Sequence, residues 1–445
     1  MPYLDLAVAA ALLAALLIGF LRRRRRPLAV SVAGAVTLVL LGVALVHEGA
    51  RWQVLLLAVG AVLVAGAVLW ARSGRSRGWA RAVAVLLSAG LIATGATAWA
   101  PPPVFVPPPT DTHAVGATAV VWTDASRDAH GGVGGEGHRS IPATIWYPAT
   151  SPGTATAYLP SRPDAEGLAG ALSAQYGLPA FVLDGLVRAQ GTASWDAPAA
   201  QGSVPVVLAS PGTASTRWLM RSWAEELASR GTVVVALDHP YDSAVAELDD
   251  GSTVRSEPTS TGDDAHDQAL ADAAARVRAA DIRATIDEIE GPARTLPALR
   301  GADPRRIVAA GHSLGGAAAV DAARLDDRIR AVVDIDGMPR SLEGTRLARP
   351  AVFVVSGDAG PNPAYAAAVS GYLADETAAR VTIAGVAHLG LVDSGLLLGP
   401  IPGITGARGP EGPRLAARAT EAVLDALHTG RGLDRDALAA IGTVG

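Results

Sequence analysis

Residues 306–323 have the sequence RIVAAGHSLGGAAAVDAA, in which an apolar run, the pentapeptide GHSLG at positions 311–315 and an alanine-rich run follow one another. The apolar run predicts a buried strand and the alanine-rich run predicts a helix. A Gly-x-Ser-x-Gly motif between strand and helix holds its serine on a sharp turn with the hydroxyl exposed above the sheet. Gly311 and Gly315 fit such a turn, because the neighbouring backbones approach too closely for a Cβ atom. The stretch therefore predicts that Ser313 is a nucleophile.

From about residue 118, short apolar runs alternate with helical patterns. Strands are expected at 119–122, 143–147, 204–209, 233–237, 307–310, 329–335, 352–355 and 381–383, and helices at 218–229, 265–290, 317–325, 364–373 and 414–427. This alternation predicts an α/β domain with a mostly parallel sheet and helices on both faces. Such sheets bind ligands beyond the carboxyl ends of their strands, which is where Ser313 falls.

The composition limits the possible functions. The chain has 445 residues, of which 50% are hydrophobic, a formal net charge of -5 and no cysteine. The length exceeds that of one small domain, and the apolar fraction indicates that part of the chain lies in lipid. The negative charge argues against a nucleic-acid partner. Without cysteine, neither a disulfide nor a thiolate nucleophile can form.

Four apolar runs occupy the first hundred residues, at about 4–21, 28–46, 54–71 and 82–100. Each approaches the roughly 20 residues that a helix needs to cross a membrane. Four tryptophans lie near the ends of these runs, as is typical of membrane interfaces, namely Trp52, Trp70, Trp79 and Trp99. Residues 1–100 are therefore expected to form an all-α region of four transmembrane helices.

The arginines predict the orientation of these helices. Positions 22–26 are all arginine and four more arginines lie within positions 72–81, whereas the loop between the second and third runs holds only Arg51. The positive-inside rule makes the two arginine-rich loops cytoplasmic, so everything after the fourth run is expected outside the cell membrane. The runs contain no charged residue expected to be buried that would mark a transport path, which favours anchoring over transport.

A proline-rich segment, PPPVFVPPP at residues 101–109, predicts a semi-rigid polyproline spacer. We expect a linker at 101–117 and the α/β domain at 118–445. Within that domain, residues 155–200 contain apolar side chains among polar ones. They could form a cap over a substrate pocket or an excursion with a purely structural role.

A serine nucleophile needs a base, which in this motif follows the serine in the chain. His388, in GVAHLGLVDSG, follows an expected strand and is the predicted base. His428 lies at the end of the last expected helix, beside Thr429 and Gly430, where the helix dipole favours a histidine. It is therefore interpreted as structural.

The orienting acid has two candidates, because two strands after the motif lead to an aspartate. Asp336 follows the strand at 329–335, and Asp358 follows the strand at 352–355. Asp334 points to the opposite side of its strand from Ile335 and is interpreted as structural. Residue spacing leaves Asp336 and Asp358 both open.

An oxyanion hole should combine the amide after the nucleophile with an amide from a loop after an earlier strand. Leu314 supplies the first amide. The strand at 204–209 leads directly into SPGT at 210–213, where the glycine permits an unusual backbone, so Thr213 is the predicted second donor. An ordinary β-turn is the alternative interpretation of this tetrapeptide.

Several segments resemble α/β-hydrolases of the platelet-activating-factor acetylhydrolase type, in the plasma and bacterial forms. The likeness covers roughly residues 141–428 and includes IPATIWYPA, VPVVLASPGT, LASRGTVVVALDHPYDSA, GHSLGG, DIDGMP and HLGLVD. It implies an α/β-hydrolase fold, with the acid after the strand that follows the nucleophile, which favours Asp336. Similar cutinase-like esterases place the acid one strand later, which would suit Asp358. Pro211 stands where the acetylhydrolases usually have histidine.

The resemblance implies hydrolysis of a lipid-like carboxylic ester through an acyl-enzyme, on a phospholipid with a short acyl chain, without a metal or organic cofactor. A cutinase- or lipase-like carboxylesterase is the alternative within the same class. A non-catalytic membrane sensor or binding protein is the alternative from another class.

Overall fold

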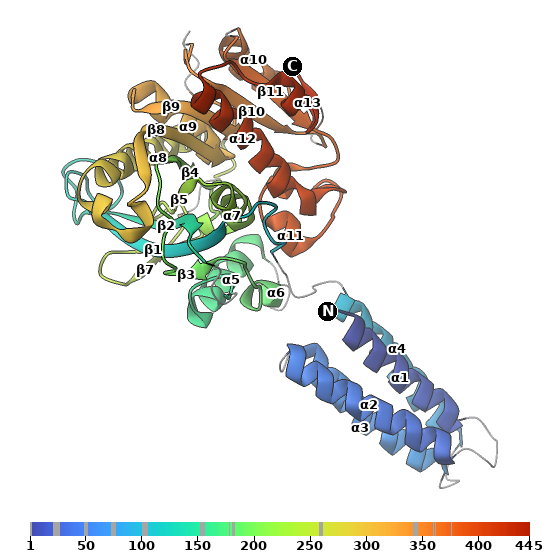
Figure 1. The fold of residues 1–445 in the computed structure, drawn as a ribbon. Coiled ribbons are helices and arrows are strands. Elements are labelled where there is room, and N and C mark those ends of the chain that lie inside the picture. The colour runs from blue at the N-terminus through green and yellow to red at the C-terminus, as the bar shows by residue number, and fades with distance from the viewer. Residues whose placement is uncertain are drawn as a thin grey trace. The chain divides into compact units, whose positions relative to one another are not determined.

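The computed structural model describes most of the chain, and Figure 1 shows its elements. The described residues are 2–20, 27–48, 52–72, 77–99, 106–151, 156–177, 179, 183–257, 261–340, 346–358, 360, 362–374 and 376–445. The chain divides into two compact units, Met1–Pro103 and Val104–Gly445.

The described part of the N-terminal unit contains four helices, one for each apolar run of the sequence. They are α1 (Pro2–Phe20), α2 (Pro27–Glu48), α3 (Trp52–Arg72) and α4 (Arg77–Trp99). α1 contacts the other three helices, and apolar side chains such as Leu12, Leu57 and Leu91 are buried among them. The arginines at 22–26, Arg51 and Arg75 lie outside the described residues, whereas Arg77 and Arg81 belong to α4 and not to a loop.

The expectation of four membrane spans is supported for one helix. Within the described residues, only Gln53–Trp70 of α3 is both long and apolar enough to cross a membrane. The apolar stretches of the other helices, Leu6–Gly19, Val30–Val46 and Ala82–Gly95, are shorter. A hydrocarbon core of about 30 Å requires about 20 apolar residues at a rise of 1.5 Å per residue, and these stretches are too short by that measure. The four helices form as predicted, but the count of four spans is not confirmed.

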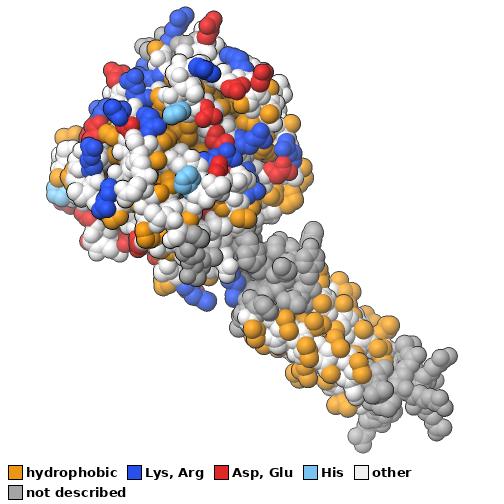
Figure 2. Space-filling view, in the orientation of Figure 1, with side chains coloured by type: hydrophobic (Ala, Val, Ile, Leu, Met, Phe, Trp, Pro, Cys, Tyr) orange, Lys and Arg blue, Asp and Glu red, His pale blue; other side chains and the backbone are white. Residues whose placement is uncertain are grey.

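Large apolar side chains also face outward from the N-terminal unit. Leu17 is 68% exposed, Val62 is 73% exposed and Leu86 is 72% exposed. Figure 2 shows hydrophobic side chains spread over the visible side of these helices. Exposed apolar side chains in this number are unfavourable in water.

The C-terminal unit is built on a ten-stranded sheet with the order β12-β11-β10-β9-β8-β4-β5-β2-β1-β3. The strands are β1 (Ala114–Asp124), β2 (Arg139–Ala149), β3 (Ser194–Trp195), β4 (Val204–Ser210), β5 (Val233–Leu237), β8 (Ala302–His312), β9 (Ile329–Ile335), β10 (Ala351–Ser356), β11 (Ala378–Ile383) and β12 (Thr443–Val444). The six strands from β11 to β5 run parallel, while β12 and β2 pair antiparallel at the two ends of this block. β6 (Val245–Glu247) and β7 (Thr253–Arg255) form a separate hairpin.

Helices cover both faces of the sheet, as the sequence predicts. The helices of this unit are α5 (Arg162–Tyr176), α6 (Asp184–Val187), α7 (Arg221–Ser229), α8 (Asp264–Glu290), α9 (Leu314–Leu325), α10 (Pro363–Leu373), α11 (Ser394–Leu398), α12 (Gly412–Thr429) and α13 (Arg435–Ala439). α7 and α12 share one apolar core with the sheet, and α8, α9 and α10 share the other. Along β4, Val207 and Ala209 enter the first core while Val206 and Leu208 enter the second, because side chains alternate along a strand.

The described part of the proline-rich segment is packed on the α/β unit and does not form the free spacer that was expected. Val106 is buried in the core, and its amide donates to the Gln190 carbonyl at 2.9 Å. The Thr110 amide donates to Glu226 at 3.1 Å, and β1 begins at Ala114, inside the expected linker. Residues 101–105 lie outside the described residues. The buried valine in the middle of the prolines explains the difference, because its apolar side chain gains more from the core than from water.

The expected insertion at 155–200 forms α5, α6 and β3. Its apolar residues Leu168, Leu172 and Leu186 are buried in the same core as α7. The Tyr158 hydroxyl lies 2.6 Å from Asp393, in the segment that follows His388. Phe181, one of its apolar residues, lies outside the described residues. The segment is therefore packed tightly onto the α/β unit and is tied to the loop of the predicted base.

Candidate active site

Ser313 is the single residue between β8 and α9, and its backbone has a conformation that L-residues rarely adopt. Its φ is 57° and its ψ is -125°, and its amide donates to the Ile335 carbonyl at 2.9 Å. A Cβ atom on Gly311 would lie 2.3 Å from the backbone of Gly315, and one on Gly315 would lie 2.0 Å from the Ser210 carbonyl oxygen. Close contacts on both sides of the turn therefore maintain the strained conformation of Ser313, as at many functional sites.

His388 and Asp336 meet at the carboxyl ends of the strands. His388 begins a single turn of 3₁₀-helix, His388–Leu391, after β11, and Asp336 follows β9 directly. The Nδ1 atom of His388 lies 2.7 Å from Oδ2 of Asp336 and donates to it, while the Ser356 amide donates to Oδ1 at 2.8 Å. The His388 side chain is 41% exposed, so the ring is partly accessible from solvent.

The charge state of Asp336 follows from these bonds. Burial by itself would raise the pKa of the carboxyl, but the hydrogen bonds from His388 and Ser356 and the attraction of the imidazole hold the pKa below its usual value. An ionised Asp336 therefore faces the ring and stabilises an imidazolium on His388.

Asp358, the alternative acid, has a different partner. It is exposed after β10, and its Oδ1 accepts a hydrogen bond from the Gly385 amide at 3.1 Å. Its backbone amide donates to the Val386 carbonyl at 3.3 Å. Asp358 therefore ties two neighbouring loops together, and the structure brings Asp336 to the histidine instead.

The two predicted oxyanion donors flank the serine. Leu314 is the first residue of α9, so its amide is one of those that a helix N-terminus leaves without an internal partner. The loop after β4 approaches from the other side, where a Cβ on Gly212 would lie 3.2 Å from Cβ of Ser313. Thr213 follows this glycine. Both predicted amides therefore lie on segments next to the nucleophile, where the positive end of the helix dipole also favours an anion.

A model of the alpha/beta hydrolase family matches residues 206–441, which is more than half of the chain. This chain belongs to the alpha/beta hydrolase family. A model of platelet-activating factor acetylhydrolase, isoform II, matches residues 106–290 of the hydrolase.

Two further proteins are similar to parts of the hydrolase, one in sequence and one in fold. A protein of Arthroderma benhamiae named "Probable 1-alkyl-2-acetylglycerophosphocholine esterase" is 28% identical over 134 residues, which are 30% of this chain and 31% of that protein. The hydrolase thus matches less than a third of this relative's length. A ferulic acid esterase from Streptomyces cinnamoneus has a similar structure, with a TM-score of 0.61 and 24% identity over 74% of the hydrolase and 95% of the esterase. This second likeness shows a shared fold.

His312 is a site residue of the hydrolase that sequence reasoning missed. Its ring is buried, its Nε2 donates to the His388 carbonyl at 3.0 Å, and the two histidine rings lie 4.5 Å apart. Burial, together with the nearby His388, lowers the pKa of His312 to about 3. A neutral His312 therefore holds the backbone of the base. The sequence signal that could have identified His312 is its position in the GHSLG motif, directly before the nucleophile.

Asp334 of the hydrolase is buried behind the turn. Its Oδ1 accepts from the Gly337 amide at 2.7 Å, and a Cβ on Gly316 would lie 2.1 Å from that oxygen. Burial raises the pKa of Asp334 well above the usual carboxyl value, which favours its protonated form. It supports the turn and does not contact His388.

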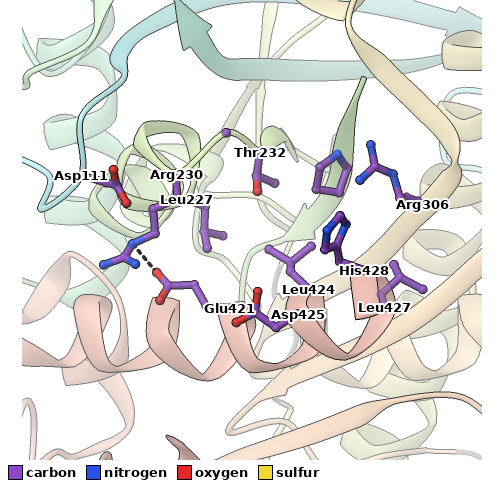
Figure 3. A pocket seen from close by; sticks show the side chains of 12 residues that line it. Asp111, Leu227, Arg230, Thr232, Arg306, Glu421, Leu424, Asp425, Leu427 and His428 are labelled. Atoms are coloured by element: carbon purple, nitrogen blue, oxygen red, sulfur yellow. Dashed lines mark ion pairs between the residues drawn. The ribbon is translucent and has the colours of Figure 1, made fainter. Parts of the chain in front are cut away.

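His428 lies far from Ser313, Asp336 and His388, the candidate catalytic residues. Together with Arg306 and Glu421, it lines a cavity of about 310 Å³ whose wall includes Pro205 and Thr232. Pro205 lies near the start of β4 and Thr232 immediately precedes β5, so this cavity is at the amino ends of the parallel strands (Figure 3). The serine is at the carboxyl ends, on the opposite edge of the sheet, so His428 cannot act on it.

Proposed function

We propose that this hydrolase is a serine esterase that cleaves carboxylic esters through an acyl-enzyme. The observation that carries the proposal is the bond from His388 to Asp336 beside the strained turn of Ser313. Asp336 fixes the tautomer in which Nδ1 carries the proton, so Nε2 of His388 is free to accept the proton of a serine hydroxyl.

In the proposed first step, the Ser313 oxygen forms a bond to the ester carbonyl carbon while its proton passes to Nε2 of His388. The amides of Leu314 and Thr213 stabilise the oxyanion. The bond to the leaving alcohol then breaks as His388 returns the proton to the alcohol oxygen. Water repeats the sequence on the acyl-enzyme and releases the acid and free Ser313.

The proposed substrate is a lipid-like ester, in particular a phospholipid with a short acyl chain. The match of residues 106–290 to platelet-activating factor acetylhydrolase supports this class, as does the name of the fungal relative. The cutinase- or lipase-like alternative needs its acid after β10, and the bond of Asp358 to Gly385 speaks against that arrangement.

We further propose that the N-terminal unit is embedded in the cell membrane as an anchor, with the α/β unit outside the cell. The outward-facing apolar side chains of α1 to α4 support lipid surroundings, because exposing these side chains to water is energetically unfavourable. The arginines at 22–26 and 72–81 support the orientation.

The proposed function is tested by labelling the full-length protein with a fluorophosphonate and assaying it on p-nitrophenyl esters and short-chain phospholipids. We expect labelling and turnover in the natural protein, and loss of both in Ser313→Ala by several orders of magnitude. Folded protein with Ser313 intact that neither labels nor turns over would favour the non-catalytic membrane sensor. Faster turnover of long-chain triglycerides than of phospholipids would favour the lipase-like alternative.

A further inference from the structure

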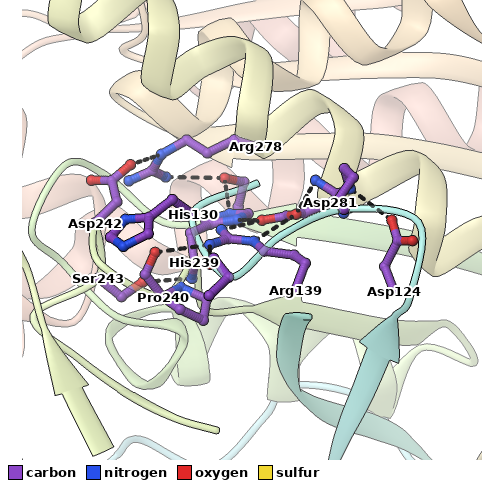
Figure 4. Close-up of polar contacts among 12 residues, drawn as sticks. Asp124, His130, Arg139, His239, Pro240, Asp242, Ser243, Arg278 and Asp281 are labelled. Carbon is purple, nitrogen blue, oxygen red and sulfur yellow. Dashed lines mark hydrogen bonds and ion pairs between the residues drawn. The ribbon is translucent and has the colours of Figure 1, made fainter. Parts of the chain in front are cut away.

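A second group of buried polar side chains lies behind the loop that follows β4. Nε2 of His239 lies 2.9 Å from the Ser210 hydroxyl, and Nδ1 of His239 lies 2.8 Å from Oδ2 of Asp281. Arg139 pairs with the same Asp281 at 2.7 Å, and Arg278 donates to the Ser210 hydroxyl at 3.2 Å. Figure 4 shows Arg139 of β2 and His239, which follows β5, close to Asp281 and Arg278 of α8.

The order serine, histidine and aspartate resembles a catalytic triad, but its burial excludes catalysis. Ser210 and Asp281 are 0% exposed and His239 is 1% exposed, so no substrate reaches the hydroxyl. The bonds have one consistent direction. Burial and the charge of Arg278 lower the pKa of His239. The neutral ring then donates from Nδ1 to Asp281 and accepts from Ser210, whose oxygen accepts from Arg278.

Arg278 connects this group to the loop next to the nucleophile. From the middle of α8, its guanidinium donates to the carbonyls of Pro211 and Gly212, the second at 3.1 Å. Its Nε donates to Asp242 at 2.5 Å. A planar guanidinium with five donors can make all these bonds at once, which a lysine ammonium cannot. Arg278 therefore binds two successive carbonyls of one loop.

The bond to Gly212 also sets the direction of the next amide. The C=O of Gly212 and the N–H of Thr213 belong to one planar peptide unit, and no cis peptide occurs in the described chain. In a trans unit these two groups point in opposite directions. Because Arg278 holds the carbonyl on its own side, the Thr213 amide points away from Arg278. A Cβ on Gly212 would lie 3.2 Å from Cβ of Ser313, so the peptide unit that carries this amide borders the nucleophile.

Two further bonds hold the same peptide unit. The Ser215 amide donates to the Gly212 carbonyl at 3.1 Å, and the Ala214 amide donates to the Asp242 carbonyl at 3.0 Å. Asp242 is the residue whose carboxylate pairs with Arg278. The loop is thus fixed on both sides of Thr213, while the Thr213 amide makes no hydrogen bond within the described chain.

We propose that Arg278 is a positioning residue, which aims the Thr213 amide into the oxyanion site and is itself held by Asp242 and by the buried Ser210–His239–Asp281 group. This inference rests on the proposed esterase function, and it assigns a role to the DHPYDSA segment and to α8 that the triad does not require. A preorganised donor of this kind stabilises the transition state without reorganising during the reaction.

The test uses the full-length protein with Arg278→Lys, which keeps the positive charge but cannot hold both carbonyls. The matched control is Arg276→Lys, at an exposed position of the same helix. The assay measures p-nitrophenyl acetate hydrolysis, with active sites counted by fluorophosphonate titration so that only folded protein contributes. We expect kcat per titrated site to fall by about 10²-fold in Arg278→Lys, as for loss of one oxyanion donor, with KM within about twofold. Arg276→Lys should match the natural protein.

A second readout separates positioning from general damage. In the matched thionoester, sulfur replaces the carbonyl oxygen and is a weaker hydrogen-bond acceptor, so its hydrolysis depends less on the oxyanion donors. We expect Arg278→Lys to lose much more activity on the ester than on the thionoester. Equal losses on both substrates, or a kcat within about threefold of the natural value, would overturn the proposal.

If Arg278→Lys gives no folded protein, Ser210→Ala is tested instead. This change removes one hydrogen bond of Arg278 and alters the side-chain volume only slightly. We expect a smaller loss of kcat on the ester, about tenfold, again at unchanged KM, and an unchanged kcat would refute the inference. The Ser313→Ala variant separates failure of the proposed esterase function from failure of the positioning role of Arg278. Persisting activity in Ser313→Ala overturns the proposed function itself, whereas a dead Ser313→Ala beside a normal Arg278→Lys overturns only the positioning role.

Discussion

Nδ1 of His388 lies 2.7 Å from Oδ2 of Asp336, although 52 positions separate the two residues in the chain. The parallel order of β9, β10 and β11 produces this contact, because it places the carboxyl ends of the three strands along one edge. Asp358, which follows β10, lies between them in sequence and bonds the Gly385 amide instead.

The first prediction distinguishes the two aspartates. Asp336→Asn keeps the shape of the side chain but favours the wrong tautomer of His388, so we expect kcat to fall by up to ~10⁴. Asp358→Asn is the matched control. It should keep near-normal turnover with only a small loss of stability, because the asparagine Oδ1 can still accept the hydrogen bond from the Gly385 amide. Steady-state kinetics and thermal unfolding of both variants measure this, and the reverse pattern would show that the acid follows β10.

The second prediction concerns the close packing of the turn. In Gly315→Ala the new methyl group would lie 2.0 Å from the Ser210 carbonyl oxygen, which is backbone and cannot move aside. We expect a loss of about 3 kcal/mol or more in the free energy of unfolding, or no folded protein.

The matched control for this variant is Gly170→Ala in α5, where a methyl group meets nothing within 4 Å. It should stabilise the protein by roughly 0.5–1 kcal/mol, since alanine has the higher helix propensity. Denaturant unfolding of both variants tests the packing, and a Gly315→Ala protein as stable as the natural one would contradict this geometry of the turn.

The third prediction concerns Asp393, which is buried beside Tyr158 and Ser222. Burial raises the pKa of Asp393 to about 7, although hydrogen bonds from Tyr158 and Ser222 oppose the increase. The Tyr158 hydroxyl also contacts the Trp218 carbonyl. One hydroxyl proton cannot serve both oxygens, whereas a protonated Asp393 can donate to Tyr158 while Tyr158 donates to Trp218.

The folded state therefore keeps a proton that the unfolded state releases above about pH 4. The stabilisation from this group is present at low pH and is lost as the pH rises through about 7. Between pH 5 and pH 7.5, the natural protein should lose roughly 2–3 kcal/mol more in the free energy of unfolding than Asp393→Asn does. Urea unfolding at the two pH values measures this difference. Parallel pH profiles would show that Asp393 is already ionised at pH 5.

The fourth prediction tests the proposed orientation in the membrane. Nine arginines lie at 22–26 and within 72–81, in or next to the two proposed cytoplasmic connections, and one, Arg51, lies between the second and third helices. A phosphatase that folds only after export should therefore be active when fused after Pro109 and inactive when fused after Gly74. A fluorescent protein that folds only in the cytoplasm should give the opposite pattern at the same two positions. Cytoplasmic signals from both fusions would place the hydrolase unit inside the cell.

Local patterns in the sequence predicted most of the fold. All eight expected strands form, and β5 and β9 have the expected bounds, because a continuous apolar run between turn residues is a local signal of a buried strand. Among the residues that the structure describes, four short strands were missed, namely β3, β6, β7 and β12. Their two or three residues carry no periodicity, so they form only where a neighbouring segment offers hydrogen bonds.

The sequence by itself determined that Ser313 is held on a turn between β8 and α9, because the glycines, the apolar run and the helix all lie within 18 residues. It also selected His388, since few histidines follow the serine. Its local patterns left Asp336 and Asp358 both open, because each follows a strand in the same way, and only the resemblance to the acetylhydrolases favoured Asp336. The path of the loop after β11 decides which aspartate the imidazole meets. The hydrogen bond from Val106 to Gln190 and the one from Arg278 to Gly212 likewise join residues 66 or more positions apart. Strand order and side-chain packing determine such contacts, and local sequence patterns do not.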